Sequence, residues 1–284
     1  MKVVVVGCTH AGTATVVNLK EMHPECDVTI YERNDNISFL SCGIALQVGG
    51  VIAEPKKLFY NSPEKLAKSG VVTKMKHDVL DIDFDNKKLK VKNLLNGEEF
   101  EDYYDKLVLT IGSWPIVPKF EGGDLENIVL CKNHDHAEII VKKTEHAKNV
   151  VVIGAGYIGV ELAEAFELKG KKVTLIDAEE RIMAKYLDKE FTDIAENEFR
   201  SKGVKLVLGE KVARFEGENG KVQKVVTDKG NYEGDLVVLC IGFAPATKIV
   251  QGKLDTLKNG AIIIDEYMRT SREDVFAAGD CCVV

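Results

Sequence analysis

A cysteine in the stretch "ISFLSCGIAL" (residues 37–46) is the first residue of this sequence that could do redox chemistry. Cys42 stands between Ser41 and Gly43, with no second cysteine close enough for a CxxC loop. One thiolate can store two electrons as a sulfenic acid, and a reductant can return that acid to the thiolate. A free cysteine can also be a small buried hydrophobe, so the role of Cys42 depends on its surroundings.

The other cysteines predict neither disulfides nor a metal site. The total is odd, and the spacing matches no CxxC pair and no set of metal ligands; the seven lie at positions 8, 26, 42, 131, 240, 281 and 282. The adjacent Cys281 and Cys282 could form a strained vicinal disulfide, but two buried thiols are the better expectation.

A glycine-rich loop at 154–159, "GAGYIG", predicts a dinucleotide site. It follows the β-branched run 149–153 and opens a helix, and Asp177 ends the next strand 23 residues after Gly154. Such glycines permit a tight turn and let the backbone approach a pyrophosphate at the helix N-terminus. A carboxylate at the position of Asp177 binds ribose hydroxyls and repels a 2′-phosphate, which favours NADH over NADPH.

A second loop of this kind lies at the N-terminus. Gly7 and Gly12 hold the first and third glycine positions, Thr9 holds the middle one, and Glu32 closes the second strand 25 residues after Gly7. Either loop alone could be a plain strand-to-helix turn that matches by chance. A chance match explains two such loops much less well, because each is followed by an acidic residue at the expected distance.

The elements around the loops form a repeated plan. Strand, helix and strand occupy residues 2–33 and again 149–178, about 145 residues apart. Each is followed by a stretch that alternates apolar and polar residues, typical of a small antiparallel meander, and then by a buried strand that ends in Ile-Gly. We therefore expect an α/β fold with two Rossmann-like, three-layer dinucleotide-binding domains, each carrying an antiparallel β-meander. A proline-bearing crossover, "GSWPIVPKFEG" (112–122), joins them.

The composition limits the classes of partner that we expect for this chain. The 284 residues are 45% hydrophobic and 29% charged, enough for two cores. No apolar run is long enough to cross a bilayer and the N-terminus does not resemble a signal peptide, so we expect a cytoplasmic protein. The formal charge of −7 argues against a nucleic-acid surface. Small-molecule substrates are the expected partners, with no nucleic acid and no membrane.

Three motifs carry a family resemblance that covers essentially the whole chain. The segments "TIGS" (110–113), "CIGFAPAT" (240–247) and "TSREDVFAAGD" (270–280) resemble the flavoprotein pyridine nucleotide-disulfide oxidoreductases. The resemblance implies that the first fold binds FAD, that the second binds the nicotinamide nucleotide, and that Asp280 contacts the ribityl chain of the flavin. The solitary cysteine in "SFLSCG" resembles the single-cysteine branch, which contains water-forming NADH oxidases, NADH peroxidases and coenzyme A-disulfide reductases.

The resemblance also predicts the domain boundaries. Residues 1–113 plus 243–284 would form the FAD-binding domain, and residues 114–242 the NAD(H)-binding domain. Members of the family continue past the Gly-Asp motif into a C-terminal interface domain that builds a homodimer, whereas this sequence stops four residues after Asp280. We therefore expect a chain that is incomplete at the C-terminus of its FAD domain, with uncertain activity of its own and with a monomer as one possible state. Ala246 replaces an asparagine that is frequent in the family.

The implied chemistry is oxidation of NADH and reduction of dioxygen to water. NADH would reduce FAD, the reduced flavin would convert dioxygen to peroxide, and the Cys42 thiolate would reduce the peroxide while becoming a sulfenic acid. His10 is the acid/base candidate, although it could also be a solvent-facing residue in the first turn of a helix. Catalytic roles are thus expected for Cys42 and His10, with FAD and NADH as cofactors and no metal.

Tyr157 and Glu161 have roles that the resemblance alone implies. An aromatic residue at Tyr157 would cover the flavin until the nicotinamide displaces it, and Glu161 would orient the carboxamide; helix packing is the alternative for Tyr157. The full set of residues expected to bind the two cofactors is Gly7, Thr9, His10, Ala11, Gly12, Glu32, Arg33, Ser41, Cys42, Thr110, Gly112, Ser113, Gly154, Gly156, Tyr157, Ile158, Gly159, Glu161, Asp177, Gly242 and Asp280.

Other functions remain open at this point. An NADH peroxidase would use the same residues with hydrogen peroxide as the oxidant, and a coenzyme A-disulfide reductase would form a mixed disulfide at Cys42. A different class is a nucleotide-binding fragment without turnover, or a redox sensor in which Cys42 reports peroxide. An electron-transfer reductase for a protein partner would not need Cys42.

Overall fold

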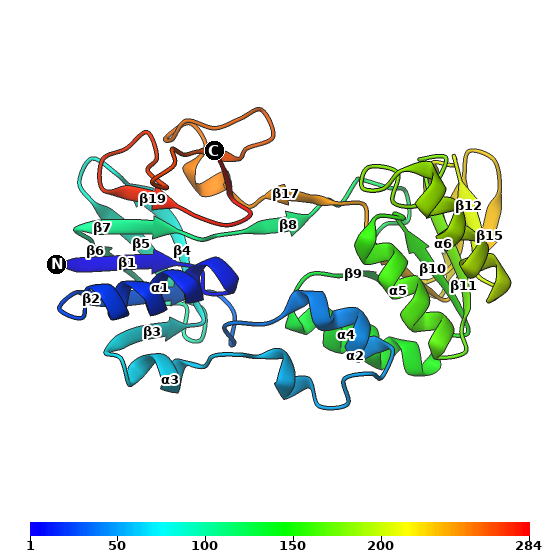
Figure 1. Ribbon diagram of the computed structural model, residues 1–284, viewed down its shortest axis with the longest axis horizontal. Coiled ribbons are helices and arrows are strands. Elements are labelled where there is room, and N and C mark those ends of the chain that lie inside the picture. The colour runs from blue at the N-terminus through cyan, green and yellow to red at the C-terminus, as the bar shows by residue number, and fades with distance from the viewer. The chain divides into compact units, whose positions relative to one another are not determined.

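The computed structural model describes residues 1–284, and the chain divides into two compact units (Figure 1). Unit 1 contains Met1–Leu40, Leu58–Trp114 and Ala244–Val284, and unit 2 contains Ser41–Lys57 and Pro115–Phe243. The divisions after Trp114 and Phe243 lie within one residue of the expected boundaries. The segment Ser41–Lys57 differs from expectation, because it groups with unit 2.

Unit 1 is built on a parallel sheet of five strands in the order β19-β7-β1-β2-β3. Their bounds are β1 Lys2–Val6, β2 Asp27–Glu32, β3 Val71–Met75, β7 Lys106–Leu109 and β19 Val275–Ala277. Because side chains alternate along a strand, Val3 and Val5 pack on the face that carries Val16 of helix α1. Val4 packs on the opposite face, among the apolar residues of the meander. Both faces of the sheet are therefore covered, as its nearly continuous apolar strands require.

The remaining elements of unit 1 surround this sheet. Helix α1 spans His10–Met22, α3 spans Pro63–Ala67, and a 3-10 turn spans Lys248–Val250. The antiparallel meander consists of β4 His77–Asp83, β5 Lys88–Asn93 and β6 Glu99–Tyr103, and the short strands β18 Ile262–Ile263 and β20 Cys282–Val283 pair near the C-terminus.

Unit 2 repeats the plan with a parallel sheet in the order β12-β11-β10-β16-β9. The strands are β9 Ile128–Leu130, β10 Asn149–Ile153, β11 Lys172–Asp177, β12 Lys205–Leu208 and β16 Leu236–Leu239; the meander is β13 Val212–Glu218, β14 Lys221–Thr227 and β15 Asn231–Glu233. Val151 and Ile153 pack against the meander through Phe215, Val222 and Val225.

The helices of unit 2 are α2 Ile44–Val48, α4 His134–His146, α5 Tyr157–Leu168 and α6 Lys189–Ser201. Helix α2 contacts α4 and α5, and its Ile44 and Val48 are buried. These contacts explain why Ser41–Lys57 belongs to unit 2 and not, as expected, to the domain of residues 1–113. The burial of apolar side chains on this short helix, and not its position in the sequence, decides which unit it joins.

The two sheets correspond strand for strand. Reading outward from the central strands, β1, β2 and β3 match β10, β11 and β12, while β7 matches β16. This confirms the predicted α/β fold of two three-layer units with a meander each. The connecting segments contain β8 Ser113–Pro115 and β17 Phe243–Pro245, which pair with each other. None of the helices combines the length and apolar character that crossing a bilayer requires.

Candidate functional site: two glycine loops and an exposed cysteine

The first glycine loop joins β1 to α1 through two positions that only glycine fits. Gly7 has a φ of +91°, and a Cβ there would lie 2.5 Å from the carbonyl oxygen of Thr110. A Cβ on Gly12 would lie 2.1 Å from the carbonyl oxygen of Gly7. The Thr110 hydroxyl donates to that same oxygen at 2.7 Å. The loop is thus a tight turn that brings the N-terminus of α1 close to the end of β1.

Glu32 holds this loop from the end of β2. Its Oε2 accepts a hydrogen bond from the Cys8 backbone N–H at 2.7 Å, and its Oε1 accepts from the backbone and side-chain nitrogens of Asn34 at 2.8 and 2.7 Å. Only 2% of Glu32 is exposed. Burial raises the pKa of the carboxyl above its ordinary value of 4.5, while the bonds from Asn34 and Cys8 act in the opposite direction.

The Gly-Asp motif lies beside the same loop. A Cβ on Gly279 would meet the Cβ of Ala11 at 2.8 Å, and the Ser113 hydroxyl donates to Asp280 at 2.8 Å. Residues from the start of α1, the end of the β7 segment and the C-terminal segment therefore meet in unit 1. Among the other predicted residues, Arg33 is exposed and forms a 3.7 Å ion pair with Asp78, and Gly112 has no atom within 4 Å of a Cβ position.

His10, the acid/base candidate, is an exposed residue that begins α1, after Thr9 at the N-cap. Its Nδ1 lies 3.2 Å from the hydroxyl of Tyr60, and the two rings stack with centroids 5.7 Å apart and 6° between their planes. Sequence reasoning missed Tyr60, which is 50 residues away. The contact holds the imidazole at the surface of unit 1 and pairs it with a second proton-carrying group.

The second glycine loop has the same backbone design. Gly154 has a φ of +103°, and a Cβ there would lie 2.3 Å from the carbonyl oxygen of Cys240; a Cβ on Gly159 would lie 1.8 Å from the oxygen of Gly154. Gly156, the middle glycine, differs from Gly154 and Gly159, because the nearest neighbour of its Cβ would be a side-chain ring carbon, of Tyr186 at 3.6 Å, and not a backbone oxygen. Backbone crowding therefore does not demand glycine at position 156, and in a dinucleotide loop the second glycine lets the pyrophosphate approach the backbone.

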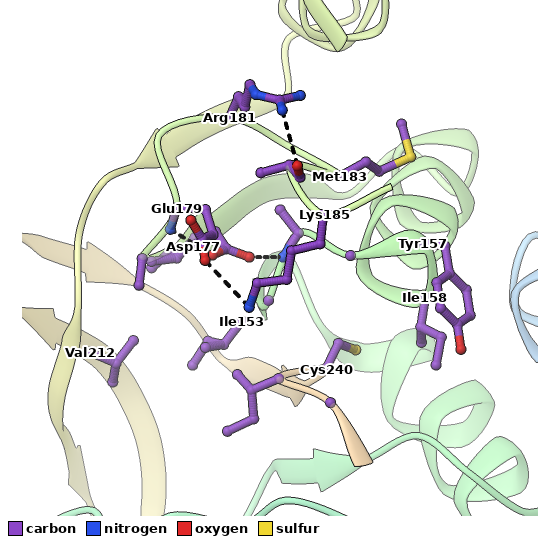
Figure 2. A pocket seen from close by; sticks show the side chains of 18 of the residues that line it. Ile153, Tyr157, Ile158, Asp177, Glu179, Arg181, Met183, Lys185, Val212 and Cys240 are labelled. Atoms are coloured by element: carbon purple, nitrogen blue, oxygen red, sulfur yellow. Dashed lines mark hydrogen bonds and ion pairs between the residues drawn. The ribbon is translucent and has the colours of Figure 1, made fainter. Parts of the chain in front are cut away.

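A cavity of about 470 Å³ opens beside this loop. Figure 2 shows Asp177 at the end of β11, where its carboxylate accepts hydrogen bonds from the backbone N–H groups of Ala155 and, at 2.8 Å, of Glu179. The predicted residues that line this cavity are Gly154, Gly156, Tyr157, Ile158, Asp177 and Gly242. Gly159 and Glu161 do not line it: Gly159 is buried in the packing of α5, and Glu161 is exposed on that helix.

Several cavity residues escaped the sequence analysis. Glu179 forms a 3.4 Å ion pair with Lys185, and the ring of Tyr186 packs edge-on against Tyr157 with centroids 5.4 Å apart. Glu210 accepts hydrogen bonds from the hydroxyls of Thr227 and Tyr232 at 2.6 and 2.8 Å. Glu179, Lys185 and Tyr186 follow β11, and Glu210 follows β12. Ligands bind at the carboxyl ends of parallel strands, and this rule is the signal that could have found these residues.

Cys42 lies in a 3-10 turn, Ser41–Gly43, directly before α2 of unit 2. It is the one exposed cysteine among the seven, none of which forms a disulfide. Burial raises the pKa of Cys8 to about 11 and that of Cys131 to about 12, so those thiols stay protonated and unreactive. Cys42 belongs to unit 2 and His10 to unit 1.

A comparison with protein families identifies the chain. The family model described as pyridine nucleotide-disulphide oxidoreductase matches residues 1–284. The chain belongs to this family. Among its members, an NADH oxidase of Enterococcus faecalis is 55% identical over 285 residues, which cover 100% of this chain and 64% of that protein. The chain thus spans about 64% of the length of this curated relative.

Two solved structures and a further curated protein are also similar to this chain. A water-forming NADH oxidase from Lactobacillus brevis bound to NADH is 53% identical, with a TM-score of 0.97 over 100% of this chain and 63% of that one. An NAD-dependent persulfide reductase from A. fulgidus is 32% identical, with a TM-score of 0.95 over 99% of this chain and 53% of its own. An NAD(P)H sulfur oxidoreductase (CoA-dependent) of Pyrococcus furiosus is 36% identical over 98% of this chain and 62% of its own length.

Proposed function

We propose that this chain carries the FAD-binding and NADH-binding parts of a water-forming NADH oxidase, with Cys42 as its peroxide-reducing thiol. The observation that carries the proposal is the combination of two glycine loops, each fixed by an acid, with a single exposed cysteine. The similarity to the NADH oxidases of Enterococcus faecalis and Lactobacillus brevis supports it.

Unit 1 fits a flavin dinucleotide. Gly7 and Gly12 bring the N-terminus of α1 close to the end of β1, and the first N–H groups of a helix, which have no partner within it, favour a pyrophosphate. Ser113 orients the carboxylate of Asp280 by a hydrogen bond, which suits an acceptor for ligand hydroxyls. Thr9 and Ala11 would hold the remaining polar groups, and Glu32 would act by fixing the loop through its hydrogen bond with the Cys8 N–H. FAD bound there would accept a hydride from NADH and supply electrons for reducing oxygen.

Unit 2 fits NADH. The backbone at Gly156 and the N-terminus of α5 would hold the pyrophosphate, while Asp177 would accept hydrogen bonds from the adenosine ribose. Tyr157 and Tyr186 stand as an aromatic pair beside the loop, so they would cover one side of the coenzyme. Glu161 lies outside the cavity lining, and its proposed contact with the carboxamide rests on the family resemblance alone.

The chemistry assigned to the chain's own residues occurs at Cys42. Its thiolate attacks one oxygen of hydrogen peroxide, an S–O bond forms, the O–O bond breaks, and the departing hydroxide takes a proton to become water. Two electrons derived from NADH and one proton then return the sulfenic acid to the thiolate and release a second water. His10, with Tyr60, is proposed to provide protons for the reduction of oxygen.

Oxygen-electrode stoichiometry tests this proposal, with FAD supplied and NADH as the only donor. We expect two NADH consumed per oxygen and no oxygen released by added catalase. In Cys42→Ser the ratio should fall to one NADH per oxygen with release of peroxide, while the buried-cysteine control Cys26→Ala keeps the wild-type ratio. Oxygen consumption with a ratio of two in Cys42→Ser would contradict the role of this thiol.

A thiol–disulfide activity is the second candidate, because Cys42 is exposed and a CoA-dependent sulfur oxidoreductase is 36% identical. Its mark would be NADH oxidation that requires coenzyme A disulfide and leaves oxygen untouched. NADH oxidation that requires added hydrogen peroxide would instead identify a peroxidase. Failure of the chain to bind or reduce FAD would favour a nucleotide-binding fragment or a redox sensor.

A further inference from the structure

A second hollow of unit 2, with a volume of about 460 Å³, lies apart from the nucleotide cavity and shares no lining residue with it. Asn127 and Asp235 line it just before β9 and β16, and Lys221 lines it at the start of β14. The nucleotide cavity collects residues from the carboxyl ends of the same sheet. The second hollow therefore lies at the amino ends of the strands, where the sequence motifs predict nothing.

The lining of this hollow is basic although the chain is acidic. Lys142, Lys143, Lys221 and His146 face a single carboxylate, that of Asp235, in a protein of formal charge −7. Both oxygens of Asp235 accept hydrogen bonds from the backbone N–H groups of Lys148 and Asn149, at 3.0 to 3.3 Å. Asp235 is thus committed to the backbone, and none of the three lysines is paired with it.

Asn127 positions one of these lysines. Its Oδ1 accepts a hydrogen bond from the Lys143 ammonium at 2.6 Å, and its Nδ2 donates to the carbonyl oxygen of Asp235 at 3.1 Å. Asn127 has a left-handed backbone with a φ of +70°, and its carbonyl accepts from the Val237 N–H at 2.8 Å. Its side chain is therefore fixed from two sides, which holds the ammonium of Lys143 at the hollow with donors to spare.

Apolar surface completes the lining, from Ile139 and Ala147. One positioned ammonium and two further lysines beside an apolar wall suit a ligand with clustered negative charge and a less polar body. We propose that this hollow binds a phosphorylated small molecule with at least two phosphate charges, distinct from the coenzyme of the glycine loop. The competing explanation is that basic residues in the last turn of α4 only offset the negative end of the helix dipole.

Amide chemical shifts of the ¹⁵N-labelled full chain test the proposal, because they separate this hollow from the glycine loops. Inorganic pyrophosphate should shift the amides of Asn127, Lys143 and Lys221 saturably, with a Kd of about 1 mM, independently of any shift at Gly154–Gly159. ADP distinguishes the sources: tighter binding than pyrophosphate indicates a nucleotide whose base uses the apolar wall, and equal binding indicates a plain polyphosphate.

Lysine variants provide the decisive contrast. Lys143→Met/Lys221→Met should weaken pyrophosphate binding at these amides by about tenfold, whereas Lys119→Met, an exposed lysine of unit 2 outside the lining, should leave it unchanged. Both variants alter surface side chains, and a melting curve checks that each folds. Shifts that do not saturate, shifts matched by chloride at equal ionic strength, or equal affinity in the double variant would each overturn the proposal.

Discussion

The two glycine loops share one backbone design, but their acidic residues differ in whether a ligand can reach the carboxylate. In both, the residue after the first glycine donates its N–H to the acid at the end of the next strand, from Cys8 to Glu32 and from Ala155 to Asp177. Glu32 is buried and accepts three hydrogen bonds from the protein, while Asp177 is half-buried and lines a cavity. Both acidic residues thus hold their loops by hydrogen bonds. Only Asp177 of unit 2 also lines a cavity that an incoming molecule can enter.

The glycines that both loops share should show the largest effect. Gly7→Ala and Gly154→Ala each place a Cβ within 2.5 Å of a backbone carbonyl at a positive φ, so each should destabilise its unit by about 2–4 kcal/mol. Gly112→Ala has a positive φ but open space and should cost about 1–2 kcal/mol. Urea unfolding measures all three. A cost at Gly7 or Gly154 no larger than at Gly112 would show that the loops relax around the new methyl group.

Substitution of the two acidic residues should lower the free energy of unfolding by different amounts. Glu32→Ala leaves the buried N–H of Cys8 and the half-buried N–H groups of Asn34 without their acceptor and should cost about 2–3 kcal/mol of unfolding free energy. Asp177→Ala should cost about 1 kcal/mol, because water from the cavity can replace the carboxylate. Equal losses in urea unfolding would contradict the contrast in burial between the two acids.

Ionisation of Glu32 should oppose folding in a defined pH range. Because its pKa is raised in the folded chain above the ordinary 4.5, the folded state binds this proton more tightly than the unfolded state does. Its contribution to stability is therefore fully present below pH 4.5 and is lost as the pH rises through the raised pKa. A ¹³C titration of the Glu32 carboxyl measures this directly, and a value below 4.5 would show that the hydrogen bonds outweigh burial.

The smallest effect concerns coenzyme choice in unit 2. Glu179→Gln removes a negative charge beside the proposed ribose site and frees Lys185 from its ion pair. We expect NADPH to bind about two- to fivefold more tightly with NADH unchanged, since exposed pairs contribute at most about 1 kcal/mol. Adding Lys185→Met should cancel the gain, and calorimetric titration of the wild type, the two single variants and the double variant measures the coupling. A gain that persists without Lys185 would assign it to the lost charge of Glu179 alone.

Local patterns predicted the sheets, the glycine loops and their acids. The β-branched runs at 2–6 and 149–153 can form only buried strands beside glycine turns, and the acids follow at a fixed distance because one helix separates the strands. The placement of Cys42 was not predictable in this way. It depends on α2, whose Ile44 and Val48 are buried, contacting helices α4 and α5, which begin 90 or more residues after α2 begins.

The partners of predicted residues were also beyond local patterns. Tyr60 stacks on His10 because the segment after the 3-10 turn Pro55–Leu58 returns to the start of α1. Glu179 and Lys185 meet because the loop after β11 folds back on itself. Such contacts depend on loop conformation, which has no periodic signature in the sequence.

Mapping where each nucleotide binds is the most direct test of two loops with separate tasks. Amide shifts of the ¹⁵N-labelled chain should change on adding FAD at Cys8, Thr9 and Gly12, and on adding NADH at Ala155, Gly156 and Tyr157. The account predicts two non-overlapping sets of shifts. Shifts from FAD at the Gly154–Gly159 loop, or from NADH at the Gly7–Gly12 loop, would contradict it.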